Sequence, residues 1–177
     1  MITCTPKKYD NPHIVIETNF GSIELELYPK QAPKTVAAFL SHVNAGFYNN
    51  ANFYRVLKND YLLPDNNYGL IQGGVYPNIK NVPAIPHEPT STTNIKHLDG
   101  TISMASQGAG TATTEFFICI GEQFSYNAGS KGTADRQGYA AFGAVVKGMS
   151  VVRSIQAEKN VADIFLKKIK IITIKAL

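Results

Sequence analysis

One arginine of this chain stands where a charged side chain is unusual. Arg55 lies in the run Phe-Tyr-Arg-Val-Leu at positions 53–57, whose aromatic and branched residues are typical of a half-buried strand. Alternation along a strand predicts that Arg55 shares a face with Phe53 and Leu57. Such an arginine either pairs with a structural carboxylate or offers its guanidinium donors to a carbonyl or amide. The residues alone leave both interpretations open.

A glutamine occupies a comparable place in the next strand-like run. Gln72 lies between Ile71 and the pair Gly73-Gly74, so it is predicted at the end of a strand. Its side-chain amide can donate and accept hydrogen bonds at the same time. It therefore either bonds to its own loop or anchors the backbone of a bound peptide, and the sequence does not choose between these roles.

The stretch from Gly100 to Gly121 is predicted to fold as strand, slim loop and strand. Its loop, residues 106–114, contains only Ser, Gln, Gly, Ala and Thr. In the second strand, residues 115–120, alternate residues that include Phe116 would face a core, which turns Phe117 outward beside the loop. An outward aromatic side chain next to a slim loop suggests a place where another polypeptide lies.

Other side chains of catalytic or ligand type lack the spacing that their chemistry needs. We therefore expect no metal site, no phosphate-binding or dinucleotide loop and no hydrolase triad. The 17 Lys and Arg residues give a net charge of +4 but are dispersed, so no nucleic-acid surface is expected. The residues considered are His87-Glu88, His97 with Asp99, Gly108-Ala109-Gly110, Ser103 and Ser106.

The elements that must hold these residues are mainly β. The strand-like runs are 13–18, 22–28, 52–57, 70–74, 101–105, 115–120, 138–147 and 169–174. One helix is predicted from Pro33 to about Gly46 and a second over 149–157. Because strands do not alternate regularly with helices, a doubly wound parallel sheet is disfavoured. A closed antiparallel barrel with two covering helices fits better, since closure removes exposed edges.

The chain of 177 residues shows no repeat and no linker, which indicates one domain over 13–177 after a flexible lead-in, 1–12. Its two cysteines, Cys4 and Cys119, are expected to be unpaired thiols. No apolar run approaches the roughly 20 residues of a membrane span. The first residues do not form a signal peptide. We expect a cytoplasmic location for the chain as given, or a periplasmic one if a leader has been removed.

Five blocks in order resemble the cyclophilin family of peptidyl-prolyl cis/trans isomerases, or rotamases, most of all its bacterial members. The blocks are Phe53-Tyr-Arg-Val56, Ile71-Gln-Gly-Gly74, Gly100-Thr-Ile-Ser-Met-Ala105, Glu115-Phe-Phe-Ile-Cys119 and the segment from Ala141 through Met149. The resemblance spans residues 13–175 and implies a closed eight-stranded antiparallel β-barrel capped by two α-helices. It also implies a monomeric isomerase that assists folding by rotating X–Pro bonds. Its partners would be proline-containing peptides and unfolded or flexible protein clients, with no cofactor or covalent intermediate.

The resemblance also assigns the site, on the outer surface of the barrel. It gives Arg55 the catalytic role, Gln72 the substrate-binding glutamine's place and Phe117 the floor of the proline pocket. It gives substrate-binding positions to Leu70, where the family usually has Met, and to Ala105, Ser106, Gln107, Glu115, Phe124 and Tyr139.

The chain departs from the family pattern at several of these places. Residues 58–69 form an insertion of unassigned role, and Gly69 stands where the family has a pocket aromatic, so Tyr68 substitutes or that wall is missing. Glu115 replaces a usual Gln and would add a negative charge beside the groove. Phe124 stands where many eukaryotic members have Trp, which predicts weak cyclosporin binding. These departures keep open a second function, a proline-peptide binding module with little turnover.

Overall fold

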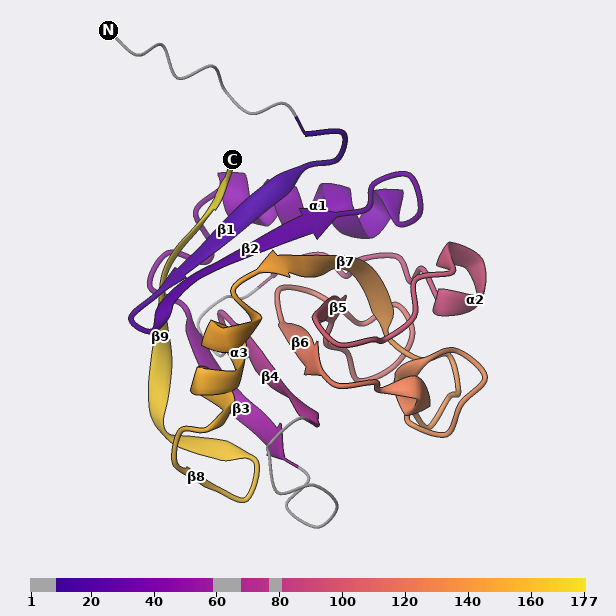
Figure 1. The fold of residues 1–177 in the computed structure, drawn as a ribbon. Coiled ribbons are helices and arrows are strands. Elements are labelled where there is room, and N and C mark those ends of the chain that lie inside the picture. Colours follow the sequence, from indigo (N-terminus) through magenta and orange to yellow (C-terminus); the bar gives the residue numbers. More distant parts are fainter. Residues whose placement is uncertain (1–8, 59–67, 77–80) are drawn as a thin grey trace, which may run out of the picture.

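The computed structural model describes residues 9–58, 68–76 and 81–177. Within them the chain forms nine strands in one antiparallel sheet (Figure 1). The strands are β1 (His13–Thr18), β2 (Gly21–Leu27), β3 (Asn52–Lys58), β4 (Gly69–Gly74), β5 (Thr101–Met104), β6 (Phe116–Ile120), β7 (Ala140–Lys147), β8 (Asn160–Val161) and β9 (Ile164–Ala176). The helices are α1 (Pro33–Asn44), α2 (Thr90–Thr93) and α3 (Met149–Gln156), with a 3₁₀ turn η1 (Phe124–Tyr126).

The sheet closes on itself. Its strand order is β1-β2-β7-β5-β6-β4-β3-β9, and β1 also pairs with β9, so eight strands form a barrel. The two-residue β8 pairs with β9 alone and lies outside the ring. The predicted closed eight-stranded barrel is confirmed. The last strand begins earlier than predicted, at Ile164, and α2, η1 and β8 lie where the sequence predicts neither a helix nor a strand.

Helices α1 and α3 confirm the two that the apolar spacing predicts. Helix α1 begins at Pro33, buries Val36, Phe39 and Val43, and packs on β7 and β9. Its first amides are capped by Glu88, whose carboxylate accepts from the backbone of Lys34 and Thr35 at 3.1 and 2.8 Å. Helix α3 packs on β2, β3, β4 and β6.

Strand β6 alternates as predicted between the core and the outer face. Phe116 and Ile118 belong to the main core. Phe117 and Cys119 lie on the opposite side in a small cluster with Leu70. The outward direction of Phe117 is confirmed, although neighbouring side chains leave it only 2% exposed.

Strand β3 differs from the predicted alternation because it contains a β-bulge. Phe53 pairs with Gly73 and Arg55 with Gln72, so Tyr54 is the extra residue. The bulge shifts the pattern, so Phe53 and Val56 point into the core. Arg55 shares the outer side with Leu57, as predicted, and with Tyr54, but not with Phe53, so the prediction from simple alternation was wrong for Phe53.

Two segments that the sequence singles out lie partly outside the described residues. Of the lead-in 1–12, residues 9–12 lie against β2, where the ring of Tyr9 stacks on His13 at 3.6 Å and Asn11 donates to Glu26. Of the insertion 58–69, Lys58 ends β3 and Gly69 begins β4, while 59–67 fall outside the description.

Candidate functional site

A groove of about 610 Å³ lies on the outer face of the barrel across β3, β4 and β6. It brings together nine of the ten predicted site residues: Arg55, Leu70, Gln72, Ala105, Ser106, Gln107, Glu115, Phe117 and Tyr139. Tyr54, Leu57, Tyr76, Thr111, Thr113, Tyr126 and Gly132 complete its lining. The site therefore joins residues from widely separated parts of the chain.

Arg55 pairs with a carboxylate, which was one of the two interpretations of the sequence, and also bonds to the side chain of Gln72. Its Nε donates to Oδ2 of Asp163 at 2.7 Å, and one terminal nitrogen donates to Oε1 of Gln72 at 2.9 Å. The hydrogen bond from Arg55 lowers the pKa of Asp163, so the carboxylate stays charged at neutral pH. Asp163 lies in the turn between β8 and β9, 108 residues further along the chain, and sequence analysis missed it.

The other end of this polar row is Glu115. The Gln72 amide nitrogen donates to the Tyr54 hydroxyl at 3.0 Å, and that hydroxyl donates to Oε2 of Glu115 at 2.6 Å. The second oxygen of Glu115 accepts from the backbone amides of Val75 and Tyr76. Glu115 thus lies beside the groove, as expected, and its carboxylate accepts hydrogen bonds from donors of the protein itself.

The apolar floor of the groove is built from aromatic side chains around Phe117. Tyr126 and Tyr139 meet it edge-on, with ring centroids 5.7 and 5.2 Å away. The ring of His97 stacks on its far side at 6.0 Å. Phe117, Tyr126 and Tyr139 line the groove together with Leu70 and give this part of it an apolar, aromatic surface.

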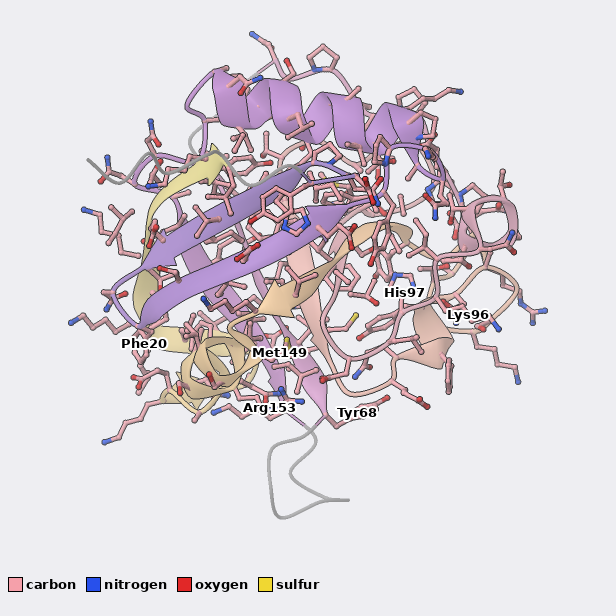
Figure 2. The ribbon with its side chains drawn as sticks, turned by 45° about the horizontal axis from the view of Figure 1, so that its top comes forward. Phe20, Tyr68, Lys96, His97, Met149 and Arg153 are labelled. Atoms are coloured by element: carbon pink, nitrogen blue, oxygen red, sulfur yellow. The ribbon has the colours of Figure 1, made fainter. Side chains whose placement is uncertain are left out.

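His97, labelled in Figure 2, is fully buried between β5 and the end of η1. Its ring nitrogens bond to Ser103 Oγ at 3.0 Å and to Asn127 Oδ1 at 2.9 Å. Burial lowers its pKa to about 4, so it is neutral at physiological pH. His97 therefore supports the aromatic floor from behind rather than lining the groove.

Two aromatic residues that the sequence analysis considers for the groove, Phe124 and Tyr68, do not line it. Phe124 begins η1 with half of its side chain exposed and is absent from the lining, whereas Tyr126, two residues later, faces Phe117. A 3₁₀ turn changes which residue points inward, and the sequence showed only a polar loop there. Tyr68, labelled in Figure 2, precedes β4 and is also absent from the lining.

Residues 105–107 form another part of the groove wall. Backbone pairing holds it, because the Ala105 amide donates to the Glu115 carbonyl at 2.8 Å. A smaller hollow of about 360 Å³ continues from this wall past Ser106 and Gln107 toward Asp135. Asp135 accepts from the Ala109 amide at 2.8 Å and so holds the slim loop in place.

Within the described ranges, no three His, Cys, Asp or Glu side chains converge as a metal site would require. The described helices include none long and apolar enough to cross a membrane. Cys119 is buried and free of a disulfide, and burial raises its pKa. The chemistry that the groove offers is thus that of a guanidinium donor beside an apolar ring pocket.

The family model described as "Cyclophilin type peptidyl-prolyl cis-trans isomerase/CLD" matches residues 13–176. The chain belongs to the cyclophilin-type peptidyl-prolyl cis-trans isomerases. A peptidyl-prolyl cis-trans isomerase of Acinetobacter baylyi is 35% identical, over 82% of this chain and 72% of the relative. Isomerase B of Escherichia coli is 32% identical, over 81% and 83%.

Solved structures agree with this fold. A cyclophilin-type isomerase of Cryptosporidium parvum superposes with a TM-score of 0.77 at 23% identity, covering 94% of this chain and 98% of the other. A further structure of that protein, in the presence of the dipeptide Ala-Pro, superposes with a TM-score of 0.74 and covers 92% and 96%. The cyclophilin fold and its isomerase family are thus established for this chain, while the role of each groove residue is a separate question.

Proposed function

We propose that this cyclophilin rotates X–Pro bonds of unfolded or flexible protein segments that lie across the groove, with Arg55 as the catalytic donor. The observation that carries the proposal is the Arg55 guanidinium held beside the Phe117 pocket within one groove. The pocket suits a proline ring, and the wall at 105–107 suits an extended backbone. The Ala-Pro dipeptide named with the related structure supports the same class of ligand.

Catalysis of this rotation requires stabilisation of a twisted peptide bond. Rotation about a peptide bond has a barrier of about 18–20 kcal/mol because the nitrogen lone pair is delocalised onto the carbonyl. Twisting the bond localises that lone pair on the nitrogen, which becomes a better hydrogen-bond acceptor. A donor aimed at this nitrogen therefore stabilises the twisted transition state more than the planar ground state.

Arg55 has donors to spare for this task. A guanidinium carries five N–H groups, and its bonds to Asp163 and Gln72 use two of them among the described residues. An acceleration of about 10⁵-fold needs only about 7 kcal/mol. One charged donor in a pocket that excludes water, together with orientation of the bond, is of the right size. No covalent step or cofactor enters this mechanism.

A second candidate function is a proline-peptide binding module with little turnover. It is favoured by the pocket's departures from the family, since Gly69 and Leu70 stand where the pattern has an aromatic and a Met.

A protease-free isomerisation assay by exchange NMR on a proline tetrapeptide separates the two functions. Arg55→Ala should lower kcat/KM by about 10²–10³-fold, the usual effect of removing a transition-state donor. Arg153→Ala is the matched control, since Arg153 also pairs with a half-exposed aspartate, Asp99, but lies on α3. If wild type and Arg55→Ala are equally slow while both bind the peptide, the chain is a binding module.

A further inference from the structure

Five side chains form one continuous row of hydrogen bonds across the outer face of β3, β4 and β6. In order they are Asp163, Arg55, Gln72, Tyr54 and Glu115, joined by contacts of 2.7, 2.9, 3.0 and 2.6 Å. The bulge in β3 makes the row possible, because it places the neighbours Tyr54 and Arg55 on the same side of the strand. Gln72 then receives a partner at each end of its amide.

The direction of every bond in this row is fixed by its two ends. An ionised carboxylate only accepts hydrogen bonds, so the Tyr54 hydroxyl must give its proton to Glu115. The Tyr54 oxygen is then an acceptor, which draws the NH₂ group of Gln72 toward it. The Gln72 carbonyl oxygen is left to face Arg55, whose nitrogens only donate.

We propose that Glu115 and Tyr54 are positioning residues, which set the orientation of the Gln72 amide and through it the plane of the Arg55 guanidinium. The inference rests on the proposed function and gives these two residues a role that does not require them to touch the peptide. A flipped Gln72 amide would present its NH₂ group to the guanidinium, donor against donor. Such a flip would release Arg55 from the orientation that catalysis needs.

Glu115 is suited to act as the fixed end of the row. Its Oε1 accepts from the amides of Val75 and Tyr76 at 2.8 and 2.9 Å and from the Thr114 hydroxyl at 3.0 Å. The carboxylate is therefore anchored to the backbone after β4 before any peptide binds. Burial and the bond to Glu115 raise the pKa of Tyr54, so its hydroxyl keeps the proton that the row requires.

The row also accounts for a departure from the family pattern. The neutral Gln usual at position 115 could present either its oxygen or its NH₂ group to Tyr54, so it would not require the Tyr54 hydroxyl to donate toward position 115. With a carboxylate at 115, the row ends in an acceptor on each side, Asp163 and Glu115. Arg55 donates to Asp163 on one side, and on the other side the bonds from Arg55 to Gln72, Tyr54 and Glu115 all point the same way. Hydrogen bonds that point the same way along a chain strengthen one another.

Tyr54→Phe tests the proposal, because it removes the hydroxyl and keeps the ring. We expect kcat/KM to fall about five- to tenfold, the effect of one hydrogen bond, and the loss to appear in kcat rather than KM. The matched control is Tyr9→Phe, which removes a hydroxyl that donates to Glu24 away from the groove. Thermal unfolding of both variants checks that the fold is intact.

The decisive measurement is a double-mutant cycle with Gln72→Ala. If Tyr54 acts through Gln72, Tyr54→Phe in the Gln72→Ala background should change kcat/KM by less than about twofold. Side-chain ¹⁵N–¹H spectra add an independent readout, since Glu115→Gln should shift and broaden the signals of the Gln72 amide and the Arg55 Nε–H.

An undiminished effect of Tyr54→Phe in the Gln72→Ala background would overturn the proposal, as would unchanged activity of Tyr54→Phe alone. Unshifted Gln72 and Arg55 signals in Glu115→Gln would overturn the assigned direction of the row. These failures differ from failure of the proposed function, in which wild type itself shows no isomerisation of the tetrapeptide.

Discussion

Asp163 provides the sharpest test of how the guanidinium is held, through the substitution Asp163→Asn. The wild-type carboxylate accepts the Arg55 Nε–H at 2.7 Å, with 35% of the arginine side chain and 40% of the aspartate side chain exposed. A hydrogen bond to a charged group contributes about 1.5–3 kcal/mol, and exposure to this degree reduces that to about 1 kcal/mol or less. The free energy of unfolding should therefore fall by no more than about 1 kcal/mol.

The effect on catalysis should be at least as large as the effect on stability. If the lost interaction, about 1 kcal/mol, serves to hold the guanidinium in its transition-state position, kcat/KM falls about fivefold, since 1.36 kcal/mol corresponds to tenfold. Because the pKa of Asp163 is lowered, the wild-type pair is intact at neutral pH. It is lost only as the pH falls below the ordinary carboxyl value of 3.8.

The assay is exchange NMR of a proline tetrapeptide at pH 7, together with urea unfolding of each variant. Asp99→Asn is the control, because Asp99 accepts from Arg153 at 2.8 Å with exposures of 42% and 35%. Figure 2 labels Arg153 on α3. We expect similar small losses of stability in both variants and a loss of activity in Asp163→Asn alone. Equal activity of the two variants would refute the reasoning.

Three further predictions concern stability and ligand binding. The pKa of His97 is 6.5 in the unfolded chain and about 4 in the folded protein, so the unfolded state takes up the proton first as the pH falls. The free energy of unfolding should therefore drop as the pH falls from 6.5 to 4, by up to about 1.4 kcal/mol per pH unit. The variant His97→Gln should flatten that slope. In Gly69→Ala the free energy of unfolding, measured with urea, should fall by about 3 kcal/mol or more, because φ is +128° and a methyl would overlap the Leu57 carbonyl. In Gly110→Ala, where φ is +73° and the methyl would enter open space, it should fall by only about 1–2 kcal/mol. With Phe124 in the place of a Trp, cyclosporin should inhibit weakly, and inhibition at concentrations below roughly 100 nM would contradict this.

The parts of the site that were predictable lie in short, continuous blocks. Gln72 and Phe117 each lie in a regular strand, so their outward direction follows from alternation and their neighbours in sequence. Arg55 was recognised by type, but its direction was not predictable, because a bulge inserts Tyr54 and shifts the alternation. The partner of Arg55 was hidden for another reason: Asp163 follows a strand of two residues, which leaves no periodic pattern.

Only part of the last strand, β9, was predictable from the sequence. Strand β9 runs from Ile164 to Ala176, but its first half presents Lys167 and Lys168 to solvent, and only the apolar second half reads as a strand. Tyr126 was missed because a 3₁₀ turn, rather than a strand, directs it to the pocket. Irregular elements set the edges of this groove, and sequence periodicity describes only regular ones.

The position of β9 has a consequence for the protein during its own synthesis. This strand pairs with both β1 and β3, and the turn before it supplies Asp163, whose backbone also accepts from Val56. A nascent chain that has not yet released residues 160–176 from the ribosome has an open sheet and an arginine without its carboxylate. Activity should therefore arise only after β9 has been synthesised and has paired with β1 and β3.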